Sequence, residues 1–128
     1  EVENLHMLMS DMLTDYYTYL ENHGEVDDEG NNYRNKWKIV PEKKRYNEVS
    51  FARKIIRLLN YDEKLFFKAL DGNYSYDAIM VDEGQNFKSE WFTVLQRVCL
   101  RDRPKNQSYG DMMVAFDKEQ KWQHCCLP

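Results

Sequence analysis

Two acidic residues follow an apolar segment in the second half of the chain. The segment AIMV at 78–81 is followed directly by Asp82 and Glu83, and then by Gln85. Carboxylate oxygens hold Mg²⁺ in proteins, usually together with substrate phosphates and water. Because adjacent residues at a strand end diverge, one carboxylate can reach a metal ion while the other reaches a water molecule, as nucleotide hydrolysis requires. Gln85 can donate and accept, and so contact a terminal phosphate.

A second apolar segment also ends in an acid. Residues 112–116 are followed by Asp117, and Gln120 comes three positions later. The carboxyl ends of parallel strands meet at one edge of a sheet, where ligands bind. We therefore expect Asp82 and Asp117 to lie together at such an edge. The alternative, that Asp82 and Glu83 only form the polar end of a strand, is disfavoured by this second acid-terminated segment.

Three helices are expected before these segments. Apolar residues at three- and four-residue spacing predict an amphipathic helix over 5–20, with Asn4 as its N-cap and Gly24 beyond its end. The same spacing predicts a second helix over 47–59, capped by Asn47, and a shorter one from 62 to 70. The predicted inner face of the second helix consists of Phe51, Ile55, Leu58 and Leu59.

The rest of the chain predicts a strand, a helix and a strand. The continuous apolar run 78–81 is typical of a strand buried on both faces of a parallel sheet. Asn86 is expected to cap a helix, whose inner face is formed by Trp91, Phe92, Leu95, Val98 and Cys99. The order indicates a parallel unit with a right-handed crossover. We predict an α/β fold, a parallel sheet flanked by helices, as one domain over 1–128 with a polar surface excursion at 25–47.

Charge limits the kind of nucleic-acid contact that is expected. The 22 acids and 18 bases give a net charge of −4, so binding to a polyanion by bulk attraction is excluded and any contact is local. Basic residues at 34–45 surround Trp37 and Tyr46, a combination that can contact phosphates and stack on a base. A solvated loop is the alternative reading of that segment. A DNA-binding fold built on it remains a separate hypothesis.

Cysteine usage and hydropathy bear on the cellular setting. Cys99, Cys125 and Cys126 show no CxxC spacing, and no segment resembles a signal peptide or a membrane span. We expect a reduced, cytoplasmic setting with no membrane partner. The thiols beside His124 are interpreted as incidental, since a tetrahedral metal site needs more ligands. The chain opens without methionine and stops shortly after a motif, so we expect it to be part of a larger protein.

Three stretches resemble motifs of one protein family. IMVDEGQNF resembles the magnesium-binding motif of superfamily 1 helicases of the UvrD and Rep type, an apolar run followed by D-E-A-Q-D. VAFDKEQKW is similar to the next motif of that family, in which a strand ends in D-x-x-Q. VENLHMLMSDML is similar to an earlier segment, a strand ending in T-F-H before a helix. The resemblance implies a partial P-loop NTPase, or RecA-like, motor domain.

The resemblance also implies roles for individual residues. Asp82 would help to hold Mg²⁺, and Glu83 would be the base that orients or activates water. Gln85 and Gln120 would sense the last phosphate of ATP and couple its loss to movement. Asp117 would position the loop that carries Gln120. The implied activity is ATP hydrolysis coupled to translocation on DNA or to its unwinding.

Implied partners are single-stranded DNA and the remaining motor domains of the same polypeptide. Trp122 would lie near the DNA path, and His6 at the DNA-facing edge. The chain departs from the family pattern where Gly84 replaces alanine, a mild change, and where Asn86 replaces aspartate. Trp122 and Gln123 replace the usual aliphatic residue and tyrosine, which weakens the case for base stacking there.

One element of a nucleotide site is absent from the sequence. None of the 128 residues belongs to a G-x-x-x-x-G-K-[ST] motif, so the chain lacks the P-loop strand and its lysine. We therefore expect the chain on its own neither to hold ATP tightly nor to hydrolyse it. The alternative is a non-catalytic, degenerate helicase-like module that keeps the sheet as a binding surface.

Overall fold

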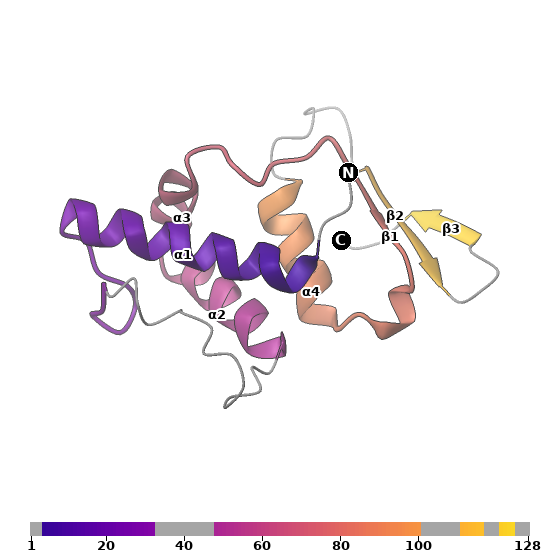
Figure 1. The fold of residues 1–128 in the computed structure, drawn as a ribbon, viewed down its shortest axis with the longest axis horizontal. Coiled ribbons are helices and arrows are strands. Elements are labelled where there is room, and N and C mark those ends of the chain that lie inside the picture. The colour runs from indigo at the N-terminus through magenta and orange to yellow at the C-terminus, as the bar shows by residue number, and fades with distance from the viewer. Residues whose placement is uncertain (1–3, 33–47, 101–110, 117–120, 125–128) are drawn as a thin grey trace. The chain divides into compact units, whose positions relative to one another are not determined.

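The computed structural model describes four stretches of the chain, which are residues 4–32, 48–100, 111–116 and 121–124. Contacts divide the chain into two compact units, Glu1–Asn73 and Tyr74–Pro128. Within the described residues, unit 1 is helical, and unit 2 contains both strands and helical segments (Figure 1). A single motor domain over 1–128 stays a prediction.

Unit 1 consists of helices α1 (Leu5–His23), α2 (Glu48–Tyr61) and α3 (Glu63–Leu70), and α1 packs on both of the others. The predicted inner face of α2 is buried, as are the aromatic side chains Tyr16, Tyr17 and Phe66 of α1 and α3. The rings of Tyr16 and Phe66 have centroids 5.3 Å apart. Burying a large apolar side chain stabilises a fold by about 1.5–3 kcal/mol, so these helices are held together mainly by their shared core.

Local residues determine where α1 begins and ends. The Asn4 side chain accepts hydrogen bonds from the backbone N–H groups of His6 and Met7, at 3.0 and 3.3 Å. Gly24 has φ 67 and donates its N–H to the Leu20 carbonyl. Both residues satisfy backbone groups that a helix end leaves unpaired, and both predictions are confirmed.

The third helix also has the predicted boundaries. Asp62 caps α3 by accepting the N–H of Leu65 at 3.1 Å. The helix stops at Asp71, which has φ 52, and Gly72 follows with φ 76. A second residue in the left-handed region prevents the chain from continuing as a helix.

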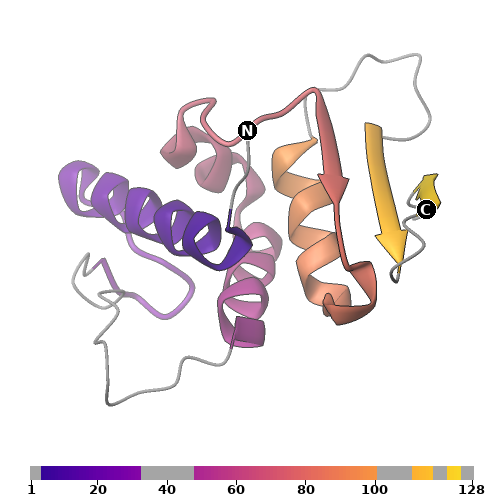
Figure 2. The ribbon, with the colours of Figure 1, turned by 45° about the vertical axis from the view of Figure 1, so that its right-hand side comes forward.

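Unit 2 alternates strands and helical segments in the order β1 (Ala78–Val81), η2 (Gly84–Asn86), α4 (Ser89–Val94), η3 (Leu95–Cys99), β2 (Asp111–Phe116) and β3 (Lys121–His124). The strand order is β1-β2-β3, with β1 parallel to β2 and β2 antiparallel to β3. Figures 1 and 2 both show α4 alongside β1. The described residues thus form a mixed fold with a small parallel strand pair flanked by a helix, compatible with the predicted α/β class. The antiparallel β3 was not predicted.

The burial expected for β1 is wrong. Met80 is 65% exposed and Ala78 is exposed, whereas Val81 is buried. Successive residues of a strand face opposite sides of the sheet, so only the side of Val81 is packed by the described residues. The strand is therefore covered on one face in the part of the chain that the structure describes.

The expected helix cap at Asn86 is also wrong. Its N–H donates to the Glu83 carbonyl at 2.9 Å, and the N–H of Phe87 donates to the Gly84 carbonyl at 3.0 Å. These bonds close the 3-10 turn η2, and the helix α4 begins only after Lys88. The chain makes a tight turn before it enters the helix, because both bonds span three residues.

The helix after this turn widens in its second half. The segment η3 is a π-helix, in which the N–H of Leu100 donates to the Leu95 carbonyl at 3.2 Å. Within the predicted inner face, Leu95, Val98 and Cys99 are buried, whereas Trp91 and Phe92 are partly exposed. The prediction of that face is confirmed for its second half.

Candidate functional site

The strand end at Asp82 leads into a tight, polar turn. Asp82 is exposed, and its Oδ1 accepts the backbone N–H of Glu83 at 2.9 Å. Glu83 has φ 56 and ψ 46, which places a non-glycine residue in the left-handed region. The Gln85 amide Nε2 donates to Glu83 Oε2. The structure therefore brings together three of the residues that the sequence identified for metal and nucleotide chemistry.

The register of the sheet places this turn at the shared end of two strands. Val81, the last residue of β1, lies opposite Val114 of the parallel strand β2. Both strands run toward the same edge, where Asp82 follows β1 and the described part of β2 ends at Phe116. Asp117 and Gln120 were expected at this edge and lie outside the described residues.

The conformation of Glu83 costs free energy. A left-handed conformation is unfavourable by about 1–2 kcal/mol for a residue with a Cβ. Such residues persist where surrounding contacts hold them, and they cluster at active sites and ligand-binding sites. Here the Asp82 carboxylate and the Gln85 amide both bond to Glu83, which fixes its backbone and its carboxylate. The turn is thus held in one geometry by its own polar side chains.

The two residues expected near DNA belong to α1 and β3. His6 is the second residue of α1 and follows the cap Asn4, so it does not end a strand as the resemblance implied. Its ring centroid is 4.7 Å from that of Phe51, and its Nδ1 is buried with no hydrogen-bond partner among the described residues. Trp122 belongs to β3, opposite Ala115, and its side chain lies outside the description. Contact of either residue with DNA stays a prediction.

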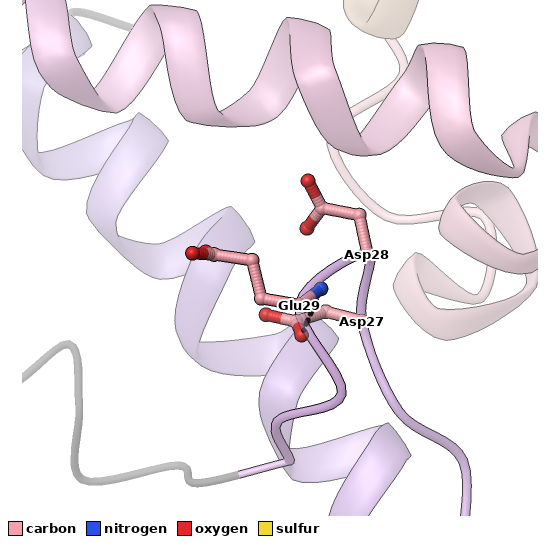
Figure 3. A group of neighbouring side chains, drawn as sticks. All are labelled: Asp27, Asp28 and Glu29. Atoms are coloured by element: carbon pink, nitrogen blue, oxygen red, sulfur yellow. Dashed lines mark hydrogen bonds between the residues drawn. The ribbon is translucent and has the colours of Figure 1, made fainter.

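A second cluster of acids lies between α1 and α2. Carboxylate oxygens of Asp27, Asp28 and Glu29 lie within 4.8 Å of one another (Figure 3). The Lys54 ammonium already lies among them, at 2.9 Å from Glu29, 3.6 Å from Asp27 and 3.8 Å from Asp28. A protein cation thus takes the place that a metal ion would need.

Arg57 supplies a second cation to this acidic cluster of three carboxylates. Its Nε is 2.6 Å from Asp28 Oδ2, and its Nη2 is 2.8 Å from Glu29 Oε1. Both cations come from α2, so the ion pairs fasten the segment after α1 to that helix. The cluster is therefore a structural ion-pair network of unit 1, and we assign no metal to it.

Asp27 is the buried centre of this network, with 2% of its surface exposed. Its carboxylate accepts the Tyr17 hydroxyl and the backbone N–H groups of Asn31 and Glu29, at 2.7 and 2.9 Å for the last two. Burial raises the pKa of this carboxyl, but these hydrogen bonds and the charge of Lys54 outweigh it and the pKa is lowered. Asp27 is therefore held ionised inside the fold.

Burial of Asp27 was not expected, because residues 25–47 were interpreted as a surface excursion. Residues 25–32 of this segment are described. Asp27 holds them in place, since the Asp27 N–H donates to the Asn31 carbonyl at 2.8 Å. Local sequence gave no signal for this burial, because the partner cations lie on α2. The basic residues at 34–45 fall outside the described residues.

Comparisons with known proteins do not assign a family. No protein-family model, no curated protein and no solved structure matches the chain. In the described part of the chain, no helix combines the length and the apolarity that crossing a membrane requires.

Proposed function

We propose that this chain carries the metal-binding and water-orienting carboxylates of a nucleotide-hydrolysing motor, and that it forms part of the first, RecA-like motor domain of an ATP-dependent DNA helicase. The observation that supports this most is the position of Asp82 and Glu83. Both directly follow β1, at the edge toward which the parallel strand β2 also runs. Ligands of open parallel sheets bind at that edge.

The residues present fit a magnesium ion. The Asp82 carboxylate is exposed and uses Oδ1 for a bond to its neighbour's N–H, which orients the side chain. Mg²⁺ needs few protein ligands, since it keeps several waters and is completed by substrate phosphates. Asp82 would hold this ion, which would neutralise charge on the phosphates.

Glu83 and Gln85 would act on the other side of the turn. Asp82 Oδ1 bonds to the Glu83 backbone and the Glu83 carboxylate bonds to Gln85, and in this proposal the two acids serve different partners. Glu83 would orient or activate the attacking water. Gln85 donates to the Glu83 carboxylate and would report whether the terminal phosphate is present. In the same proposal Asp117 and Gln120 complete the site from the end of β2.

The remaining parts of the motor would come from outside this sequence. The P-loop lysine, ATP binding and the second motor domain would be supplied by the rest of a longer polypeptide, with single-stranded DNA as partner in a cytoplasmic setting. Trp122 and His6 would lie toward the DNA. The chain on its own would be inactive.

The test uses ATP hydrolysis by the longer polypeptide that contains this sequence. Glu83→Gln should reduce hydrolysis by about 100-fold or more while nucleotide binding persists, since the base is lost and the fold is not. Asp82→Asn should weaken the dependence on Mg²⁺. Asp77→Asn is the matched control, because Asp77 is exposed and precedes β1 at the opposite end of the strand. Normal hydrolysis by the Glu83 variant would refute the proposal.

The second candidate is a non-catalytic, degenerate helicase-like module. It is favoured by Asn86, which removes one charge from the turn, and by the absence of a P-loop motif from the 128 residues. Nucleotide binding separates the two candidates: a longer polypeptide that binds no ATP, with or without Mg²⁺, is a scaffold and not a motor.

A further inference from the structure

Gly84 has no room for a side chain, because it lies close against β2. The residue is buried at the start of η2, where the turn lies against β2. A Cβ added at Gly84 would lie 2.3 Å from Cγ1 of Val114 and 3.1 Å from Cε1 of Phe116. Carbon atoms that are not bonded pack favourably at about 3.5–4.0 Å, so the first of these contacts is impossible without movement.

The glycine is required here for space. The structure gives Gly84 no left-handed φ, in contrast to Gly24 and Gly72, around which nothing lies within 4 Å of an added Cβ. Against the family pattern, glycine in place of alanine at position 84 was expected to be a mild change. In this chain alanine would not fit without movement, because the absence of a methyl group lets the turn lie directly on the Val114 side chain of β2.

We propose that Gly84 is a positioning residue of the carboxylate site: without a Cβ, the turn rests on β2 and so holds Asp82 and Glu83 at the common end of both parallel strands. The chemistry assigned to those carboxylates rests on the proposed function. The contact itself rests on the geometry of Gly84 and Val114 alone.

Two features link the glycine to the carboxylates. Gly84 follows Glu83 directly, and the Glu83 carbonyl accepts the N–H of Asn86 at 2.9 Å within the same turn. The Gly84 carbonyl accepts the N–H of Phe87 at 3.0 Å. If the turn moves off β2 to admit a methyl group, both bonds and the left-handed Glu83 move with it.

The experiment compares Gly84→Ala, Val114→Ala and the double variant in the 128-residue chain. Val114→Ala removes the atom that would clash with the new methyl group, so it should rescue the first substitution. Mn²⁺ replaces Mg²⁺, and paramagnetic broadening of the Asp82 and Glu83 amide signals gives its affinity. Amide hydrogen exchange of Asn86 and Phe87 reports the geometry of the turn. Gly72→Ala controls for general destabilisation, since φ 76 disfavours a Cβ there although no atom lies within 4 Å of it.

The expected result is selective and reversible. Gly84→Ala weakens Mn²⁺ binding by about tenfold or more, the usual effect of losing a group that orients metal ligands. It also accelerates exchange of Asn86 and Phe87, whereas Gly72→Ala changes neither property. The double variant returns both to the level of Val114→Ala. A double variant as impaired as Gly84→Ala, or unchanged binding and exchange in Gly84→Ala, would overturn the inference.

Failure of the proposed function would look different. If Mn²⁺ broadens no signal near Asp82 in the unchanged chain, and Asp82→Asn leaves the spectrum in Mn²⁺ the same, the metal assignment is refuted. The exchange rates then decide the role of Gly84. Faster exchange in Gly84→Ala that Val114→Ala reverses supports positioning of the turn, and unchanged exchange refutes it.

Discussion

Replacing Asp27 by asparagine tests the buried ion-pair network of unit 1. The carboxylate accepts the Tyr17 hydroxyl on Oδ2 and two backbone N–H groups on Oδ1, and Oδ2 lies 3.6 Å from the Lys54 ammonium. An asparagine with its oxygen at the Oδ1 position keeps the backbone bonds. It turns an NH₂ group toward the hydroxyl and the ammonium, so that side of the network is lost.

The magnitude follows from these partners. A hydrogen bond to a charged group contributes about 1.5–3 kcal/mol, and breaking a buried ion pair costs about 3–5 kcal/mol. Lys54 keeps Glu29 at 2.9 Å, which places the effect at the lower end of the second range. We expect Asp27→Asn to lower the free energy of unfolding by about 3 kcal/mol near neutral pH.

The stability difference between the original chain and Asp27→Asn should also depend on pH. Because the pKa of Asp27 is lowered in the folded state, its stabilisation is fully present above the unfolded pKa of about 3.9 and is lost as pH falls through the folded pKa. The difference between the original chain and Asp27→Asn should therefore be large near neutral pH and shrink well below pH 4.

Urea denaturation followed by helical circular dichroism measures both quantities, because the long helices belong to unit 1. Asp11→Asn is the control: Asp11 is exposed on the same helix as Tyr17, and its replacement should change stability by less than about 0.5 kcal/mol. A difference for Asp27→Asn below about 1 kcal/mol near neutral pH, or one that stays constant into acid, would refute the reasoning.

The other predictions concern the same unit and the same denaturation assay. Tyr17→Phe should lower stability by about 2 kcal/mol because it removes the hydroxyl that donates to Asp27. Tyr16→Phe should raise stability by about 1 kcal/mol, since its buried hydroxyl has no hydrogen-bond partner among the described residues; equal effects at the two tyrosines would contradict both statements. Asn4→Ala should lower the free energy of unfolding by about 1 kcal/mol through loss of the N-cap. An unchanged urea midpoint would show that the stability of α1 does not depend on this cap. Gly24→Ala should cost about 1 kcal/mol because φ 67 disfavours a Cβ, and a stabilised variant would contradict that conformation.

The boundaries of α1 and α3 could be predicted from the sequence because their causes are local. The Asn4 and Asp62 side chains bond to N–H groups two or three residues away, and Gly24 ends α1 by its own backbone conformation. The inner face of α2 followed from spacing alone. The parallel pairing of β1 and β2 could be predicted from the order strand, helix, strand.

Features that depend on distant partners could not be predicted. Glu29 meets Lys54 and Arg57 across separations of 25 and 28 residues, so nothing near residue 27 signals a buried acid. The strand β3 is polar and short, and it exists through its antiparallel pairing with β2. The need for Gly84 depends on Val114, which approaches it only through the sheet.

The candidate site was predicted in part. Asp82, Glu83 and Gln85 lie together as expected, because they are close in sequence and follow one strand. The left-handed Glu83 and the turn that delays α4 were not expected, since a cap at Asn86 fits the sequence equally well. Sequence patterns pointed to these side chains, whereas the shape of the turn follows from its hydrogen bonds and its packing on β2.

The π-helix η3 has a consequence for changes in chain length. A π turn holds about one residue more than an α turn, so the stretch Leu95–Cys99 contains a residue that regular helix geometry does not need. Deleting one residue there should let the segment rewind as an α-helix and keep the flanking side chains in phase. The same deletion in the middle of α1 would rotate everything beyond it by about 100° and turn its apolar side chains into solvent.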